Sequence, residues 1–221
     1  GLGAAYIEKA VDASLQRLGI ETIDLYLSHW PDAETPYTET LGAYEKLLQK
    51  GKVRAVGASN LDANQLREAL TTARERKLPR YAVLQPEYNL YDRSGFEGAL
   101  QDLCIKEEIG VITYFGLAKG FLTGKYREKS DLAQSQRGED VADYMNPRGM
   151  QILEALDQVA KRHNARPAEV ALAWVMAQPG VTAPIASATS VEQVRSLVRA
   201  ASLNLEVADL ALLNGTGPRQ L

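Results

Sequence analysis

The sequence predicts an α/β protein with a parallel sheet, because short apolar strands alternate with amphipathic helices along its 221 residues. Four of the expected strands begin about 30 residues apart, the size of one strand–helix–strand repeat. A third observation is that polar side chains gather where these strands end. A chain of this length can bury a core without the help of disulfides or metals.

Five strands are expected. In the first, Ile23, Leu25, Leu27 and His29 alternate with other residues and so share one face of a strand. The other four are similar apolar runs bounded by glycine, proline or polar residues. The expected strands cover residues 23–30, 53–60, 81–87, 110–117 and 181–186.

Helices are expected between the strands. Asp62 can cap the helix at 63–76, with Gln65 three residues later as in a capping box. Gly51 is placed to end the helix at 38–50, and Pro167 to open the helix at 167–178. The expected helices cover residues 5–18, 38–50, 63–76, 96–108, 150–163, 167–178 and 191–200, and a polar loop covers 123–148.

Composition excludes several classes of protein. Lys and Arg total 25 and Asp and Glu total 28, a net charge of −3 that argues against a nucleic-acid or acidic-membrane partner. The longest apolar run, residues 170–177, is too short to span a bilayer. The polar, acidic N-terminus is unlike a secretory signal, so we expect a cytoplasmic protein.

The cysteine and the two histidines limit metal and redox chemistry. Cys104, the single cysteine, cannot form an intramolecular disulfide, and its apolar helical surroundings predict a buried, inert thiol. One cysteine and two histidines are too few for a zinc finger or an iron–sulfur site, so we expect no metal. His163, in the sequence KRHN, is interpreted as part of a solvated helix terminus.

The polar residues at the strand ends bear on the architecture. Several strands that deliver polar groups to one rim are typical of a β/α barrel, whereas a doubly wound sheet concentrates its site in one crevice. Five strands are fewer than the eight of a barrel, so both architectures stay open at this point. The polar groups are Ser28, His29 and Trp30, then Ser59 and Asn60, Gln85, Tyr114 and residues 187–190.

Taken singly, these residues and motifs have ordinary explanations. His29 could be structural, Ser59 and Asn60 a turn with a helix cap, Gln85 a core amide and Tyr114 a packing residue. GLG at 1–3 lacks a preceding strand, and GFLTGKY at 120–126 departs from a phosphate-binding loop in spacing and in its final residue.

A series of motifs nevertheless resembles the aldo-keto reductase family, whose members are (β/α)8 TIM barrels that use a nicotinamide cofactor without a Rossmann domain. The order and spacing of the motifs fit over essentially the whole chain. They are SLQRLG at 14–19, IDLYLSHWP at 23–31, GKVRAVGASN at 51–60, QPEYN at 85–89, GFLTGKY at 120–126, ALAW at 171–174 and PIASATSVEQ at 184–193.

The resemblance implies that residues 1–221 are one domain holding strands four to eight of such a barrel, with 118–149 as a long loop that covers the cofactor. In this family the catalytic Asp, Tyr and Lys lie on the first three strands and the catalytic His on the fourth. His29 is therefore the tetrad member expected here, and we expect the printed residues alone not to reduce carbonyls. The complete chain is expected to reduce aldehydes or ketones by hydride transfer from NAD(P)H. The alternative is a non-catalytic cofactor-binding or regulatory subunit of the same fold.

The resemblance also implies roles for individual residues. His29 would orient the substrate carbonyl and Trp30 would line the substrate pocket, with a small-molecule carbonyl compound as the substrate. Ser59, Asn60 and Gln85 match the residues that hold the nicotinamide carboxamide, and a hydroxyl and two amides suit that group. Tyr114 matches the aromatic residue that stacks on the nicotinamide ring.

The remaining implied contacts concern the phosphates. Two departures from the family pattern bear on them: Phe115-Gly116 replaces a common Ser-Pro, and residues 187–189 carry no base, which leaves Arg195 as the nearest one. The expected cofactor is NADPH, with NADH also possible. The pyrophosphate contacts are Phe115, Leu117, Lys125 and Arg137, and the contacts near the adenosine 2′-phosphate are Ser187, Thr189 and Gln193.

Overall fold

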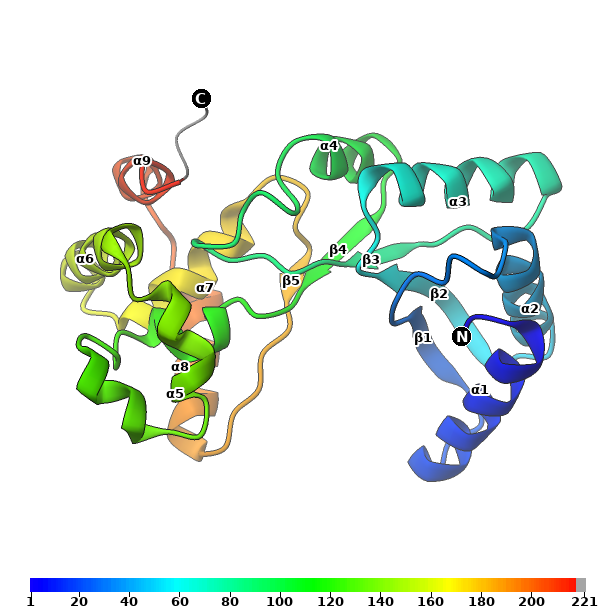
Figure 1. The fold of residues 1–221 in the computed structure, drawn as a ribbon, viewed down its shortest axis with the longest axis horizontal. Coiled ribbons are helices and arrows are strands. Elements are labelled where there is room, and N and C mark those ends of the chain that lie inside the picture. The colour runs from blue at the N-terminus through cyan, green and yellow to red at the C-terminus, as the bar shows by residue number, and fades with distance from the viewer. Residues whose placement is uncertain (218–221) are drawn as a thin grey trace. The chain divides into compact units, whose positions relative to one another are not determined.

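The computed structural model describes residues 1–217, and they form two compact units (Figure 1). The first unit consists of Gly1–Pro86 and Gly98–Val111, and the second of Glu87–Glu97 and the described residues from Ile112 onward. The expectation of a single domain over 1–221 stays a prediction, and residues 218–221 lie outside the described part of the chain.

The first unit has a parallel sheet in which strand order follows chain order. β1 (Ile23–Ser28) pairs with β2 (Val53–Ser59), β2 with β3 (Val83–Gln85), and β3 with the first residues of β4 (Gly110–Thr113). Crossovers between parallel strands are almost always right-handed, so an order without reversal carries every helix to the same side of the sheet. This order favours the barrel alternative over the doubly wound sheet, in which the order reverses.

The helices of the first unit lie along one side of its strands (Figure 1). They pack in sequence, each against the next along the chain. The predicted capping box is confirmed: Asp62 Oδ1 accepts from the Gln65 N–H at 2.8 Å, and Gln65 Oε1 accepts from the Asp62 N–H at 2.9 Å. The helices are α1 (Ala4–Leu18), α2 (Tyr37–Gln49), α3 (Ala63–Arg76) and α4 (Ala99–Lys106).

The second unit holds the end of β4, where Ile112 and Thr113 pair with the short strand β5 (Ala183–Pro184). Its centre is α7, whose Trp174 is fully buried. α7 packs against α6 and α8, and α9 packs against α6. These helices are α6 (Pro147–His163), α7 (Pro167–Ala177), α8 (Val191–Ser202) and α9 (Val207–Asn214).

All five predicted strands are longer than those the structure shows, and three of them by four residues. The predicted strand 110–117 ends at Thr113, and Tyr114 forms only an isolated bridge with Glu87. Phe115 then has a φ of 54°, which no strand accommodates. The strands expected at 81–87 and 181–186 shorten to three and two residues, and each reaches a proline, which cannot donate to the ladder.

The predicted polar loop 123–148 is also wrong in detail, because the segment is built from short helical turns. α6 begins at Pro147 instead of residue 150, because Asn146 accepts from the Gly149 N–H at 2.9 Å and caps the helix. The turns are the 3-10 helices η1 (Ala118–Thr123), η2 (Lys129–Gln134) and η3 (Ala142–Tyr144) and the α-helix α5 (Gly138–Val141).

The interpretation of His163 as part of a solvated terminus is wrong. Its Nε2 lies 2.6 Å from Oδ2 of Asp209, a carboxylate with 1% exposure in α9, a helix that the sequence analysis did not predict. Arg162 lies 2.8 Å from the same carboxylate. His163 therefore helps to hold α9 on α6. The prediction for Cys104 is confirmed: the thiol is buried, and burial raises its pKa to about 11.

Candidate functional site

The first unit brings five of the predicted residues to the carboxyl ends of neighbouring strands. His29 and Trp30 follow β1 and are exposed, and their rings stack with centroids 5.6 Å apart and an angle of 18° between their planes. The register places Ser59, the last residue of β2, beside Gln85, the last of β3. Because parallel strands end at one edge of the sheet, these side chains share a rim.

Hydrogen bonds connect the members of this rim. The buried hydroxyl of Ser59 donates to the Gln85 carbonyl at 2.6 Å. Asn60 has a φ of 61°, and its amide Nδ2 donates to the His29 carbonyl at 2.9 Å. A left-handed conformation is tolerated better by asparagine than by most residues. Asn60 therefore fixes the segment that carries His29 relative to the end of β2.

Behind the rim lies a hydrogen-bonded group of buried hydroxyls that the sequence analysis did not connect. Ser28 Oγ lies 2.6 Å from the hydroxyl of Tyr44 and 3.3 Å from that of Tyr81. Burial raises the pKa of both tyrosines, that of Tyr81 to about 12, so both stay neutral at physiological pH. Tyr44 lies in the predicted helix at 38–50, and a helical pattern does not show which strand residue its hydroxyl will meet.

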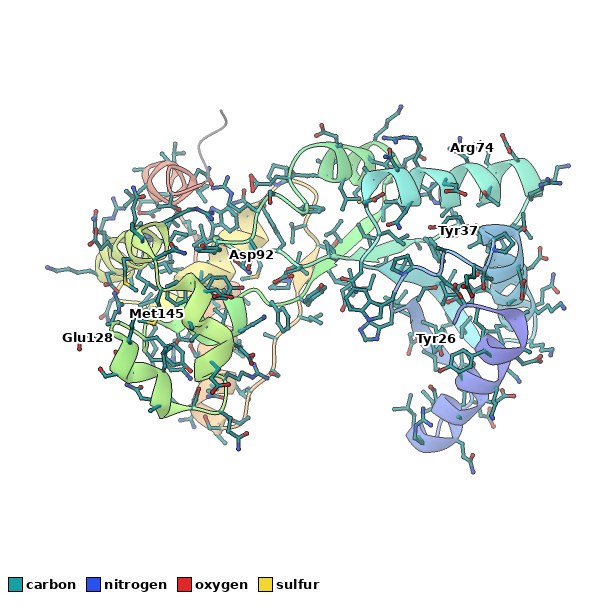
Figure 2. The ribbon with its side chains drawn as sticks, in the orientation of Figure 1. Tyr26, Tyr37, Arg74, Asp92, Glu128 and Met145 are labelled. Carbon is teal, nitrogen blue, oxygen red and sulfur yellow. The ribbon has the colours of Figure 1, made fainter. Side chains whose placement is uncertain are left out.

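A cavity of about 600 Å³ opens beside His29 and Trp30 within the first unit. Tyr26 lines it and packs edge-on against Tyr44, with ring centroids 6.4 Å apart. Tyr26 is labelled in Figure 2. The other lining residues are Tyr44 of α2 and residues from 1–10 of the N-terminal segment and α1 and from the stretch 27–34. The cavity can accept a small molecule next to the imidazole.

Tyr114 is the first predicted site residue of the second unit. Its ring is half-buried and meets the Phe115 ring edge-on, with centroids 5.0 Å apart and planes at 74°. Burial raises the pKa of the Tyr114 hydroxyl, and the nearby Glu87 carboxylate adds to the rise. The Tyr88 N–H donates to the Tyr114 carbonyl at 3.2 Å, which ties this residue to the segment after β3.

The segment after Tyr114 has an unusual backbone. Phe115, Ala118 and Lys119 all have positive φ, at 54°, 49° and 57°. Leu117, with a φ of −104°, precedes two of these left-handed residues. Alternation of right- and left-handed residues turns successive N–H groups toward one side and creates a concavity suited to anions. The segment thus has both the strain and the polarity common at binding sites.

Basic side chains lie along this segment. Lys119 lies over the Phe115 ring, with Nζ 5.7 Å from the centroid, and Lys125 is exposed and lies over the Tyr126 ring at 5.1 Å. Arg137 is exposed and directly precedes α5. The structure therefore leaves the Lys125 and Arg137 side chains accessible to a ligand.

The predicted residues near the last strand form a local hydrogen-bonded group. Oε1 of Gln193 accepts from the N–H of Thr189 at 2.6 Å and from its hydroxyl at 3.1 Å. Ser190 caps α8 by accepting from the Gln193 N–H at 3.2 Å. Ser187 is exposed, as is Arg195 in α8. Thr189 and Gln193 thus engage each other, while the Ser187 hydroxyl remains exposed.

Residues 1–217 lack two further features. No helix there is long and apolar enough to cross a membrane. The same residues hold no group of three or more His, Cys, Asp or Glu side chains arranged to bind a metal ion.

Comparison with known proteins identifies the family. The sequence model of the Aldo/keto reductase family matches residues 1–216. The chain belongs to this family. The structural comparison agrees: a thermostable aldo-keto reductase, Tm1743, solved with the inhibitor epalrestat, is similar to this chain with a TM-score of 0.79 and 27% identity, covering 98% of this chain and 68% of that one.

Curated members of the aldo/keto reductase family are similar over most of the chain. The NADH-specific methylglyoxal reductase of Escherichia coli (strain K12) is 33% identical over 94% of this chain and 63% of its own length. The aldo-keto reductase yakc [NADP(+)] of Schizosaccharomyces pombe is 33% identical over 81% of this chain and 53% of its own. The L-glyceraldehyde 3-phosphate reductase of E. coli is 30% identical over 95% of this chain and 62% of its own length.

These comparisons confirm the family resemblance and the α/β fold with a parallel sheet. The family match runs almost from end to end of the chain. The chain spans between 53% and 65% of the length of the curated relatives it matches. The comparisons leave the roles of individual site residues as predictions.

Proposed function

We propose that this protein is an NAD(P)H-dependent oxidoreductase that reduces small aldehydes or ketones to alcohols. The observation that carries the proposal is the rim of the first unit. There the exposed His29 ring stacks on Trp30, the Asn60 amide donates to the His29 carbonyl, and the Ser59 hydroxyl donates to the Gln85 carbonyl. Two of the similar proteins are reductases whose names specify NADH or NADP. Those names support a nicotinamide cofactor for this chain as well.

The architecture that fits this proposal is an eight-stranded barrel, in which β1 to β5 correspond to strands four to eight. The strand order of the first unit supports it, because it does not reverse. In the same proposal residues 1–221 belong to one domain, and the segment 118–149 covers the bound cofactor. We further propose a cytoplasmic protein without nucleic-acid or membrane partners, on the composition of the chain.

The side chains of the first unit fit a nicotinamide carboxamide. That group has two N–H donors and one carbonyl acceptor, and Ser59, Asn60 and Gln85 supply a hydroxyl and two amides on adjacent strand ends. The Ser59 hydroxyl already donates to Gln85, so its oxygen would act as an acceptor toward the carboxamide. The cofactor, when bound, supplies a hydride to the substrate carbonyl.

The predicted residues of the second unit, taken by themselves, fit other parts of a nicotinamide dinucleotide. The half-buried Tyr114 ring provides an aromatic face for stacking. The backbone around Phe115 and Leu117, with Lys125 and Arg137, provides N–H groups and positive charges for a pyrophosphate. Near the adenosine, Ser187, Thr189 and Gln193 provide hydroxyl and amide groups.

His29 and Trp30 would act on the substrate. The imidazole is exposed beside the cavity, so it can donate a hydrogen bond to a carbonyl oxygen and stabilise the charge that grows there during reduction. The Trp30 ring, 61% exposed and stacked on His29, offers an apolar wall that orients the carbonyl compound and excludes water. In a cofactor-binding protein without catalysis, substitution of His29 would not change the rate of carbonyl reduction, because there would be none.

His29→Ala tests the proposal. Loss of a positioned hydrogen bond to the developing charge should lower kcat/KM about tenfold or more, with little change in cofactor affinity. His163→Ala is the matched control, because His163 pairs with Asp209 and its loss should reduce stability and not the rate. Steady-state reduction of a panel of aldehydes and ketones by the complete chain and its variants would measure the effect. An unchanged kcat/KM in His29→Ala would remove His29 from the mechanism, and absence of any turnover would favour the binding-subunit alternative.

A further inference from the structure

Asn89 is a buried amide whose bonds link parts of the second unit that are distant in sequence. It has no exposed surface. Its Oδ1 accepts from the N–H groups of Tyr91 at 2.8 Å and Asp92 at 2.7 Å. Its Nδ2 donates to Asp92 Oδ2 at 3.0 Å and to the Phe115 carbonyl at 3.0 Å. The two donors and two acceptor positions of the amide are thus all in use.

The bond to Phe115 holds a strained residue. A bulky aromatic side chain is rare at a φ of 54°, and such a conformation persists only when surrounding contacts enforce it. The Phe115 carbonyl accepts twice, from Asn89 and from the Ala118 N–H at 2.8 Å. Asn89 is the side chain that enforces this turn from outside it. The conformation of this turn sets the direction of the Tyr114 and Phe115 rings.

Asp92, labelled in Figure 2, extends the same group to the segment 118–149. Its Oδ2 also accepts from the Tyr144 hydroxyl at 2.7 Å. The Tyr144 ring stacks on Phe121 of η1, with centroids 5.4 Å apart and planes at 17°. The proposed pyrophosphate segment is therefore held at its start by Asn89 and near its end through Asp92.

We propose that Asn89 is a positioning residue for cofactor binding: it fixes the left-handed turn at Phe115 and so presents the Tyr114 ring and the backbone at Phe115 to the dinucleotide. The inference rests on the proposed function, because it assigns Asn89 a part in that site. Asn89 itself is fully buried and engaged, so it acts through Phe115 and Asp92 and not by touching the ligand.

A double-mutant cycle with Phe115→Gly tests the proposal. Glycine adopts positive φ without strain, so a chain with Phe115→Gly no longer needs the Asn89 bond to hold the turn. Dissociation constants for NADPH and NADH are measured by fluorescence titration in the parent, Asn89→Ala, Phe115→Gly and the double variant. Hydrogen exchange of residues 115–120 without cofactor reports on the turn directly. Asn214→Ala is the control, because it removes a side-chain bond to Trp174 in the same unit.

We expect Asn89→Ala to raise the dissociation constants of both cofactors about tenfold and to speed hydrogen exchange in the turn. In the Phe115→Gly background, the same change should raise the dissociation constants by less than about twofold. Asn214→Ala should change stability and not affinity. If Asn89→Ala does not fold, Asn89→Asp, which keeps the acceptor for Tyr91 and Asp92, should show the same loss. Unchanged affinity in a folded Asn89 variant, or losses that add fully, would overturn this inference alone. A parent protein that binds neither cofactor would overturn the proposed function, and this inference with it.

Discussion

Removing the Tyr114 ring should weaken NADH and NADPH by the same factor. The ring is half-buried in the structure, so part of its surface remains for a ligand. Covering roughly 40 Å² of apolar surface contributes about 1 kcal/mol, and aromatic stacking adds about 0.5–1.5 kcal/mol. The sum exceeds the roughly 1.4 kcal/mol that corresponds to a factor of ten, so Tyr114→Ala should raise both dissociation constants at least about tenfold.

Fluorescence titration of both cofactors into the protein and its variants would measure this loss. Tyr114→Phe is the matched variant: it keeps the ring and removes the hydroxyl, so it should lose much less affinity than Tyr114→Ala. Equal effects on NADH and NADPH are essential to the reasoning, because the two cofactors share the nicotinamide half and differ at the 2′-phosphate. If Tyr114→Ala left both affinities intact, the assignment of the β4 end to the nicotinamide would be refuted.

Three further predictions concern cofactor choice and stability. Arg195→Ala should weaken NADPH and spare NADH, because its charge could pair only with the 2′-phosphate; an unchanged ratio in titrations would place the basic contact elsewhere, for example at Arg137. Asp62→Ala should lower the free energy of unfolding by about 1 kcal/mol through loss of the α3 cap, seen as a lower denaturation midpoint. Burial alone would raise the pKa of Asp209, but hydrogen bonds from His163 and the Glu206 N–H and the charge of Arg162 outweigh it and hold the pKa below its ordinary value. This carboxylate therefore stabilises the fold above its unfolded pKa and loses that contribution as pH falls through the lowered value, so Asp209→Asn should cost stability at pH 7 and little in strong acid.

The sequence predicted the elements well where the signal is local. The capping box at Asp62 and Gln65 sits where expected, and the helix it opens has the predicted bounds. All five strands were located, because their apolar runs are bounded by turn residues. The strand ends were less accurate, since nothing in the local sequence after Thr113 showed that Phe115 would turn left-handed.

For the candidate site too, the sequence predicted the residues with a local signal and missed the contacts that depend on packing. The sequence identified His29, Ser59 and Gln85 from their positions at strand ends and from the family motifs, and the register places Ser59 beside Gln85. It named Ser28 as a polar residue at a strand end but missed the bonds of Ser28 to the buried hydroxyls of Tyr44 and Tyr81. Those bonds depend on which elements pack against one another.

By itself, the sequence determined the alternation of strands and helices, the helix caps, the family and the residues at the strand ends, because each depends on neighbours a few positions apart or on motif order. Tertiary structure decided the pairs that join distant residues: Asn89 with Phe115, 26 positions apart, and His163 with Asp209, 46 apart. Such pairs need two elements to be packed before a buried donor can find its acceptor. Packing brings these groups together and removes water from them, so the left-handed turn at Phe115 and the anchoring of α9 follow from the fold and not from the local chain.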